Sequence, residues 1–184
     1  MEIHMGKENK GFAVIGEKVS LREITLEDTE LIVKWRNNER VRGNFVFREH
    51  FTNEMHEAWF RNKVQKGFVK QFIICENAGD HRPVGSVYFR DIDESTGTAE
   101  YGIFIGEDDA IGKDYGNETA LLALSYAQDV LKLKKIVLRA FKNNEAAIRS
   151  YANAGFVKTK DLLAVECSDG QKSDMILMEK GLNT

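Results

Sequence analysis

A glycine-bearing segment, residues 108–118, most strongly constrains how this chain can fold and what it can hold. It reads Asp-Asp-Ala-Ile-Gly-Lys-Asp-Tyr-Gly-Asn-Glu and separates a strand-like run, residues 99–105, from a helical run, residues 119–131. Glycines let the backbone turn tightly and approach an anion, and the first unpaired N–H groups of the following helix point at that anion. The segment therefore predicts a ligand that carries phosphate, most simply a pyrophosphate.

Composition excludes several classes of function. The 184 residues suffice for one domain with a proper core. Because 26 basic and 29 acidic residues give a net charge of −3, we expect no dedicated nucleic-acid surface. No apolar run approaches the roughly 20 residues that span a bilayer, and the N-terminus lacks the apolar core of a signal peptide. We therefore expect no membrane insertion.

The cysteines and histidines do not form a recognisable metal or nucleophile motif. Cys75 and Cys167 lie far apart without metal-ligand spacing, and a reduced, cytoplasmic setting is expected for them. The four histidines form no HxH or HExxH pattern, so no metal site is expected. No serine lies in a Gly-x-Ser-x-Gly turn, which disfavours a nucleophilic triad.

The first part of the chain predicts a leader, a strand and two helices. Residues 1 to about 15 are polar and aperiodic, and we expect a flexible leader there, followed by one domain over residues 16–184. Residues 19–24 alternate apolar and polar side chains, as a half-buried strand does. Thr25 and Thr52 each stand where a helix N-cap is expected, before apolar residues at helical spacing.

The remaining elements define the fold class. Three strand-like runs, residues 71–76, 84–91 and 98–105, are separated by turn signals and predict an antiparallel meander. After the glycine-bearing helix come an apolar strand at 135–141, a helix capped by Asn143 or Asn144 and ended by Gly155, and final strands near 156–159 and 173–179. The order β-α-α-β-β-β-α-β-α-β-β predicts an α/β domain of the α+β kind with a mixed sheet.

Two segments, taken with this element order, resemble the GCN5-related N-acetyltransferase (GNAT) superfamily. The more specific is residues 142–156, which is similar to the family's N-x-x-(A/S)-x-x-x-Y-x-x-x-G-F segment through Asn144, Tyr151 and the Gly155-Phe156 ending. Residues 111–118 resemble the family's pyrophosphate loop, although Ile111 replaces Gln or Arg and Asp114 replaces the first motif glycine. A carboxylate beside a pyrophosphate is expected to repel it by about 1 kcal/mol when solvated.

The resemblance implies a single GNAT-like domain whose fourth and fifth strands, residues 98–105 and 135–141, splay apart to admit acetyl-CoA. It assigns Tyr151 as the general acid for the thiolate, and a backbone N–H near residues 103–105 as the donor to the oxyanion. The alternative for Tyr151 is a contact between helix and sheet. The implied coenzyme-binding residues are Phe104, Ile105, Ile111, Gly112, Lys113, Tyr115, Gly116, Asn117, Asn144 and Ser150.

The general base and the acceptor site stay open at this stage. Glu100 and His56 are both candidate bases, against a salt-bridged carboxylate and a packing histidine respectively. Trp35, Arg36, Arg42 and Trp59 are candidate acceptor-binding residues, because aromatic rings stack on a base or sugar, and Arg36, Arg40 or Arg42 can pair with phosphate. The alternative is that both tryptophans belong to the core.

The expected function is acetyl-CoA-dependent N-acetylation of a primary amine on a small molecule. The Trp35-Arg36-Asn37 region resembles a subgroup that acetylates nucleotide-linked amino sugars, including the pseudaminic-acid pathway enzymes, which slightly favours such an acceptor. Similar segments occur in enzymes that acetylate ribosomal proteins, so a protein N-terminus is the alternative, and a non-catalytic coenzyme A-binding module is a third. The sequence leaves a homodimer open.

Overall fold

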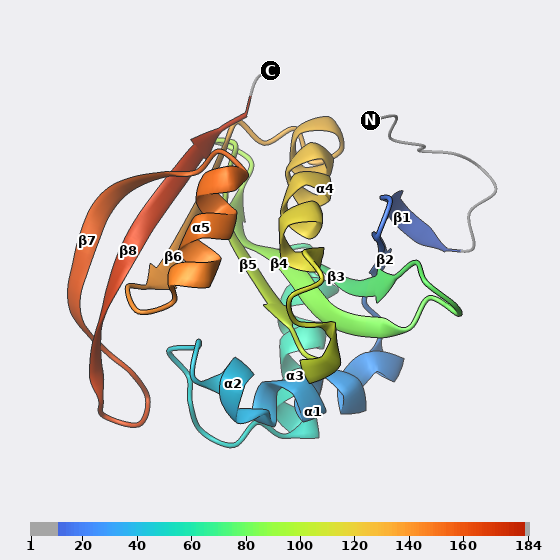
Figure 1. Cartoon of the computed structure of the whole chain (residues 1–184), viewed down its shortest axis with the longest axis horizontal. Helices are drawn as coiled ribbons and strands as arrows, with labels where there is room; N and C mark the ends of the chain where they lie inside the picture. The colour runs from blue at the N-terminus through green and yellow to red at the C-terminus, as the bar shows by residue number, and fades with distance from the viewer. Residues whose placement is uncertain (1–10, 183–184) are drawn as a thin grey trace.

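A computed structural model describes residues 11–182 and contains one eight-stranded mixed sheet in the order β1-β2-β3-β4-β5-β6-β8-β7 (Figure 1). The strands are β1 (Phe12–Ile15), β2 (Val19–Glu23), β3 (Val69–Glu76), β4 (Pro83–Asp93), β5 (Thr98–Ile105), β6 (Lys135–Phe141), β7 (Val157–Glu166) and β8 (Lys172–Gly181). The helices are α1 (Thr29–Asn37), α2 (Glu39–Arg42), α3 (Asn53–Trp59), α4 (Tyr115–Asp129) and α5 (Glu145–Asn153), with the short helices η1 (Leu26–Asp28), η2 (Phe60–Val64) and η3 (Asp108–Ala110).

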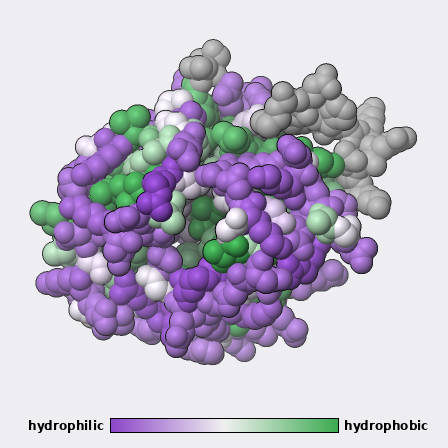
Figure 2. All heavy atoms as spheres, viewed as in Figure 1, coloured by the Kyte–Doolittle hydropathy of each residue, from purple (hydrophilic) through white to green (hydrophobic). Residues whose placement is uncertain are grey.

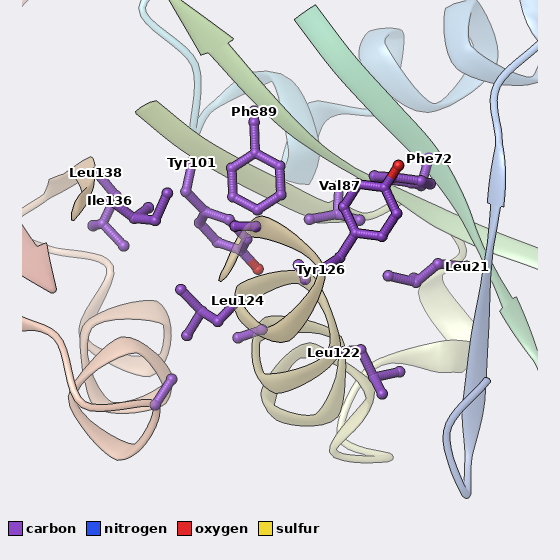
Figure 3. Close-up of a cluster of buried hydrophobic side chains, with 14 of the residues drawn as sticks. Leu21, Phe72, Val87, Phe89, Tyr101, Leu122, Leu124, Tyr126, Ile136 and Leu138 are labelled. Carbon is purple, nitrogen blue, oxygen red and sulfur yellow. The ribbon is translucent and has the colours of Figure 1, made fainter. Parts of the chain in front are cut away.

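The sheet is covered on both faces, as the alternation along β3 demonstrates. Phe72 and Ile74 pack in the cluster that contains α4, whereas Ile73 and Cys75 pack with α1 and η2. Successive side chains of a strand point to opposite faces, so one buried strand serves two cores. Figure 3 shows the α4 side of this core, where Leu122, Leu124 and Tyr126 meet the sheet residues Leu21, Phe72, Val87, Phe89, Tyr101, Ile136 and Leu138.

The predicted α/β fold is confirmed, with two corrections to its elements. Phe12–Ile15 forms β1, which pairs antiparallel with β2 and buries Val14, so the expected leader does not reach these residues. Residues 1–10 of that leader lie outside the described residues. The sixth expected strand, 156–159, is longer in the structure, where β7 runs from Val157 to Glu166. Since β7 is an edge strand, its mostly exposed side chains carry no apolar alternation that would have indicated its full length.

The expected separation of the fourth and fifth strands is present between β5 and β6. The two strands pair in parallel at only three positions, where Thr98 faces Lys135, Ala99 faces Ile136 and Glu100 faces Val137. Beyond these pairs the strands diverge. Beyond β5 the chain passes Gly106, where an added Cβ would lie 2.1 Å from Cγ of Trp35. Between β5 and η3 the chain therefore passes close to α1, and α4 begins shortly after η3.

Candidate active site at the strand split

A cavity of about 950 Å³ opens where β5 leaves β6. This volume is at the upper end of the range for small-molecule sites. Its lining comes from α1, α2 and the segment after it, α3, the sheet strands β3, β4, β5, β6 and β8, the segment from η3 to the start of α4, and α5. Figure 2 shows a hollow in the corresponding face, with apolar residues at its bottom and hydrophilic residues around its rim.

One end of the cavity is the amino end of α4. Asp114 precedes the helix but its side chain does not cap it, so the helix start lacks the side-chain acceptor that an N-cap aspartate normally supplies. The cavity lining includes Tyr115, Gly116 and Asn117, the first three residues of α4. Their amides precede the first intrahelical bond, which runs from Glu118 N to Asp114 O. This helix end is therefore suited to bind an anion.

Gly116 is explained by a ligand better than by packing. Its φ is not in the left-handed region, and a Cβ added there would meet nothing within 4 Å. Glycine near a helix start has no conformational purpose here and weakens the helix relative to alanine. The open space beside Gly116 is what a close-approaching phosphate requires.

The other predicted coenzyme residues divide into two groups. Ile111, Gly112 and Asn117 line the cavity. Lys113, by contrast, is absent from that lining and lies 3.7 Å from Glu76, to which the Tyr115 hydroxyl also donates at 3.0 Å. The side chains of Lys113 and Tyr115 therefore face Glu76, which leaves the amide of Tyr115 as its contribution.

The α5 segment joins the same site from the opposite side. Asn144 caps α5 by accepting from the Ala147 amide, and its side chain donates to Asn44 at 2.9 Å. The Ser150 hydroxyl donates to the Asn117 side chain on α4. Asn144 and Ser150 both line the cavity, as expected, but their side chains are already engaged with the protein.

The open edge of β5 supplies backbone groups to the split. Gly106 N donates to Val84 O, and bonding alternates along an antiparallel pair, so Ile103 and Ile105 turn their N–H and C=O groups away from β4. Arg40 occupies one of them by donating to Ile105 O at 3.0 Å. The Phe104 side chain packs against Trp35 and Phe45, so it shapes the wall of the cavity on the α1 side.

Tyr151 lines the cavity from α5 with its ring edge-to-face against Tyr101, centroids 6.1 Å apart. Burial raises the pKa of its phenol, and the nearby Tyr88 adds to this shift. A phenol that stays protonated at neutral pH can donate a proton but does not act as a base.

Glu100 is bound on both sides by arginines. Arg90 donates to it at 2.8 Å and Arg139 at 3.0 Å. Burial disfavours ionisation of Glu100, yet the hydrogen bonds from Arg90 and Arg139 outweigh it and lower the pKa. A carboxylate stabilised by two cations is a weak base.

The hydrogen bonds around His56 determine which of its two ring nitrogens carries the proton. Its Nδ1 lies 2.9 Å from Thr29 Oγ1, and that hydroxyl donates its own proton to Leu26 O at 2.8 Å. Thr29 must therefore accept from Nδ1–H, which makes Nε2 a bare acceptor. Nε2 is buried without a partner within residues 11–182, and burial lowers the pKa of His56. His56 lines the cavity.

Only two of the four residues predicted to bind the acceptor substrate line the cavity. Trp35 is fully buried, bonds Glu107 at 2.7 Å and is absent from the cavity lining, so the core interpretation holds for it. Arg42 is also absent from the lining. Trp59 lines the cavity and donates to Gln71 at 3.1 Å. Arg36 lines it with its guanidinium 3.4 Å from the centroid of Phe45.

Sequence reasoning missed a row of polar residues on the cavity side of the sheet. Gln71, Tyr88, Arg90 and Arg139 line the cavity from β3, β4 and β6. The only available signal was polar residues at alternate positions of β4, where Tyr88 and Arg90 share a face. The register that brings them beside Gly102 and Glu100 depends on the folded sheet.

A comparison with protein families settles the class. Residues 18–157, more than half of the chain, match the family described as the acetyltransferase (GNAT) domain. The chain belongs to this family. Acetyl-CoA is the cosubstrate of GNAT enzymes, so the expected family, enzyme class and cosubstrate are confirmed at that level.

Individual proteins and a solved structure are similar to this chain in sequence or in fold. An uncharacterized protein of Methanocaldococcus jannaschii is 32% identical over 149 residues, covering 79% of this chain but 30% of that protein, so the chain spans about a third of its length. Acetyltransferase PseH of Campylobacter jejuni is 27% identical and covers 73% of this chain and 80% of its own length. The Vibrio cholerae spermidine N-acetyltransferase, solved with CoA and spermine, has a TM-score of 0.83 at 21% identity, covering 90% of this chain and 96% of that one.

Two further findings concern the described part of the chain. Between residues 11 and 182, no helix is long and apolar enough to cross a membrane. The same residues contain no group of three or more histidine, cysteine, aspartate or glutamate side chains arranged to hold a metal ion.

Proposed function

We propose that this GNAT domain N-acetylates the primary amine of a small molecule that also carries an anionic group, such as a nucleotide-linked amino sugar. The observation that carries the proposal is Arg36, a largely buried cation without a carboxylate partner in the cavity lining. Burial lowers its pKa to about 10. Its Nε has no partner within the described residues, and its charge rests on the face of Phe45.

An unpaired buried charge is costly, and an incoming anion offsets that cost. Guanidinium is the side chain best suited to carboxylate and phosphate oxygens. Across residues 11–182 the cavity lining holds four arginines, Arg36, Arg40, Arg90 and Arg139, against two carboxylates, Glu100 and Asp114. This balance favours an anionic acceptor and disfavours a polycation such as spermidine.

The part of the cavity near Arg36, which we assign to the acceptor, is also partly closed by residues 43–51. We name this segment the strap. Several strap residues line the cavity, and the strap is bonded to the hairpin of β7 and β8, where Ser168 N donates to Val46 O and Arg48 N donates to Ser168 Oγ. A covered site suits a compact acceptor better than an extended peptide. Protein N-termini are therefore the second candidate.

The reaction requires a base, an oxyanion donor and an acid, and we assign these roles to three parts of the cavity. His56 Nε2 takes a proton from the acceptor ammonium, in preference to Glu100, which both arginines already hold. A β5 amide at Ile103 or Ile105 donates to the oxygen of the reacting carbonyl as the C–N bond forms. Tyr151 gives its proton to the sulfur as the C–S bond breaks, and the second proton of the attacking nitrogen, released as the amide forms, restores the Tyr151 phenol. Acetyl-CoA supplies the acetyl group as an activated thioester.

The test is a thiol-release assay with three acceptor classes at equal concentration: a nucleotide-linked amino sugar, spermidine, and a peptide with a free N-terminus. We expect the first to give the highest kcat/KM, and Arg36→Gln to raise its KM at least about tenfold, the value of one lost charge-assisted bond. The same variant should leave the KM of spermidine unchanged. Preferential turnover of spermidine or peptide by the wild type would contradict the proposal.

A further inference from the structure

Asp114 places a negative charge where the coenzyme diphosphate is expected. Its φ is +66°, in the left-handed region, where aspartate is tolerated better than most non-glycine residues. This explains how it can replace a motif glycine without breaking the turn before α4. Its charge remains, however, beside the uncapped amides of the helix.

Lys18 neutralises that charge. Its Nζ lies 3.1 Å from the Asp114 carboxylate, and the side-chain amide of Asn117 also donates to that carboxylate. These two hydrogen bonds, the one from Lys18 first, lower the pKa of Asp114. The pair is half-exposed, so it stands at the edge of the cavity and not in the core.

The turn that carries Lys18 is fastened to α4. Glu118, in the first turn of that helix, accepts from the backbone N–H groups of Glu17 and Lys18, the latter at 2.9 Å. Gly16 permits this approach, because a Cβ there would lie 2.4 Å from Glu118 Oε1. The turn between β1 and β2 is thus held against the amino end of α4 by the hydrogen bonds to Glu118. These bonds position Lys18 beside Asp114.

We propose that Lys18 is a positioning residue for coenzyme binding: it cancels the charge of Asp114, so that the amino end of α4 accepts the diphosphate without repulsion. This role rests on the proposed coenzyme site at residues 111–118. It assigns a function in the site to the turn between β1 and β2, and explains why a carboxylate can replace a glycine in the loop.

A charge cycle tests the role. CoA is titrated calorimetrically into the wild type, Lys18→Met, Asp114→Asn and the double variant. Lys18→Met should weaken the Kd about fivefold to tenfold in low salt, less at high ionic strength, and adding Asp114→Asn should restore it to within about twofold of the wild type. Lys135→Met is the matched control, since Lys135 is also 45% exposed and paired with a carboxylate, Glu179. It should leave the Kd unchanged.

Equal losses from Lys18→Met with and without the Asp114→Asn substitution, or no loss in either case, would overturn the role. Thermal unfolding of each variant checks that the turn stays folded. A wild type that binds CoA without turning over any amine would contradict the proposed function and leave the charge cycle decisive for Lys18. A wild type that binds no CoA would overturn both.

Discussion

His56 and Tyr151 face the same cavity with opposite chemical preferences. Burial lowers the pKa of the imidazole and raises the pKa of the phenol, so that near pH 7 one is unprotonated and the other protonated. Environments that push two titratable groups apart in this way are how one site supplies both a base and an acid. Neither residue carries a formal charge in this state, which suits the buried ring of His56 and the half-buried ring of Tyr151.

Tyr151→Phe should retain the fold and the affinity for acetyl-CoA but lose at least about 100-fold in kcat, the lower end for removal of a general acid. The ring contacts with Tyr101 and Phe156 remain in phenylalanine, which is why stability should hold. Steady-state thiol release and coenzyme titration measure the two quantities. An unchanged kcat would exclude the acid role.

His56→Asn should keep the bond to Thr29, because its amide nitrogen takes the place of Nδ1, while removing Nε2. We expect the wild-type kcat/KM to fall on the acid side, below about pH 6.5, and the variant to be slow throughout and without this limb. A variant with wild-type rate and the same acid limb would assign the base to another group.

The same ring makes stability depend on pH. The folded-state pKa of His56 lies below its unfolded value of about 6.5, so its contribution is complete above that value. As the pH falls below about 6.5 the unfolded chain binds a proton that the folded chain does not, and the free energy of unfolding decreases. Urea titrations from about pH 7.5 to about 5.5 should show this decrease in the wild type and a flatter profile in His56→Asn.

At the scale of elements, α4 combines a core face with an open amino end. Its buried residues anchor it to the sheet (Figures 1 and 3), while Gly116 and Asn117 near its amino end line the cavity. The helix is rigidly placed by its packing, so its uncapped end is held in position for a ligand. In the first turn of α4, the Tyr115 side chain belongs to the core, whereas Gly116 and Asn117 line the cavity and are available for binding.

Gly116→Ala separates these two roles. Since an added Cβ meets nothing within 4 Å, the variant should be as stable as the wild type or gain up to about 1 kcal/mol in free energy of unfolding. Its affinity for CoA should fall, because the methyl group occupies the space for the diphosphate, and Gly116→Glu should abolish binding through bulk and charge. Thermal unfolding and CoA titration check both; retained affinity in Gly116→Glu would mean that the diphosphate lies elsewhere.

At the scale of the molecule, the strap links the proposed acceptor site to the hairpin of β7 and β8. Arg48 donates to the strap carbonyl of Phe45 at 3.1 Å, pairs with Asp169 at 3.5 Å and lies over the ring of Phe141. Phe45 in turn supports the Arg36 guanidinium. One arginine thereby holds the strap against β6 and the hairpin of β7 and β8.

Arg48→Ala should loosen the strap and raise the KM of an anionic acceptor several-fold, with the Kd for CoA unchanged because the start of α4 is not touched. Arg149→Ala is a suitable control, since Arg149 pairs with Glu145 on the exposed face of α5. Equal changes in the acceptor KM and the CoA Kd would indicate general destabilisation instead of a local effect on the acceptor site.

Local sequence determined much of this protein. Thr25, Thr52 and Asn144 lie at N-caps as predicted, and strand alternation and turn signals located the meander. The segment around Tyr151 and the glycine loop identified the family later confirmed. These features succeed because capping, periodicity and turn conformation depend on residues within a few positions of one another.

Only the tertiary structure decided which side chains meet. Arg90, Glu100 and Arg139 come together from three strands, His56 takes its tautomer from a threonine 27 residues earlier, and Lys18 reaches Asp114 across 96 residues. Trp35 lies in the core, and Lys113 faces Glu76. Periodicity assigns a residue to a face of its own element, but charge pairing, burial and tautomer depend on the neighbours that sheet register and helix packing bring to that face.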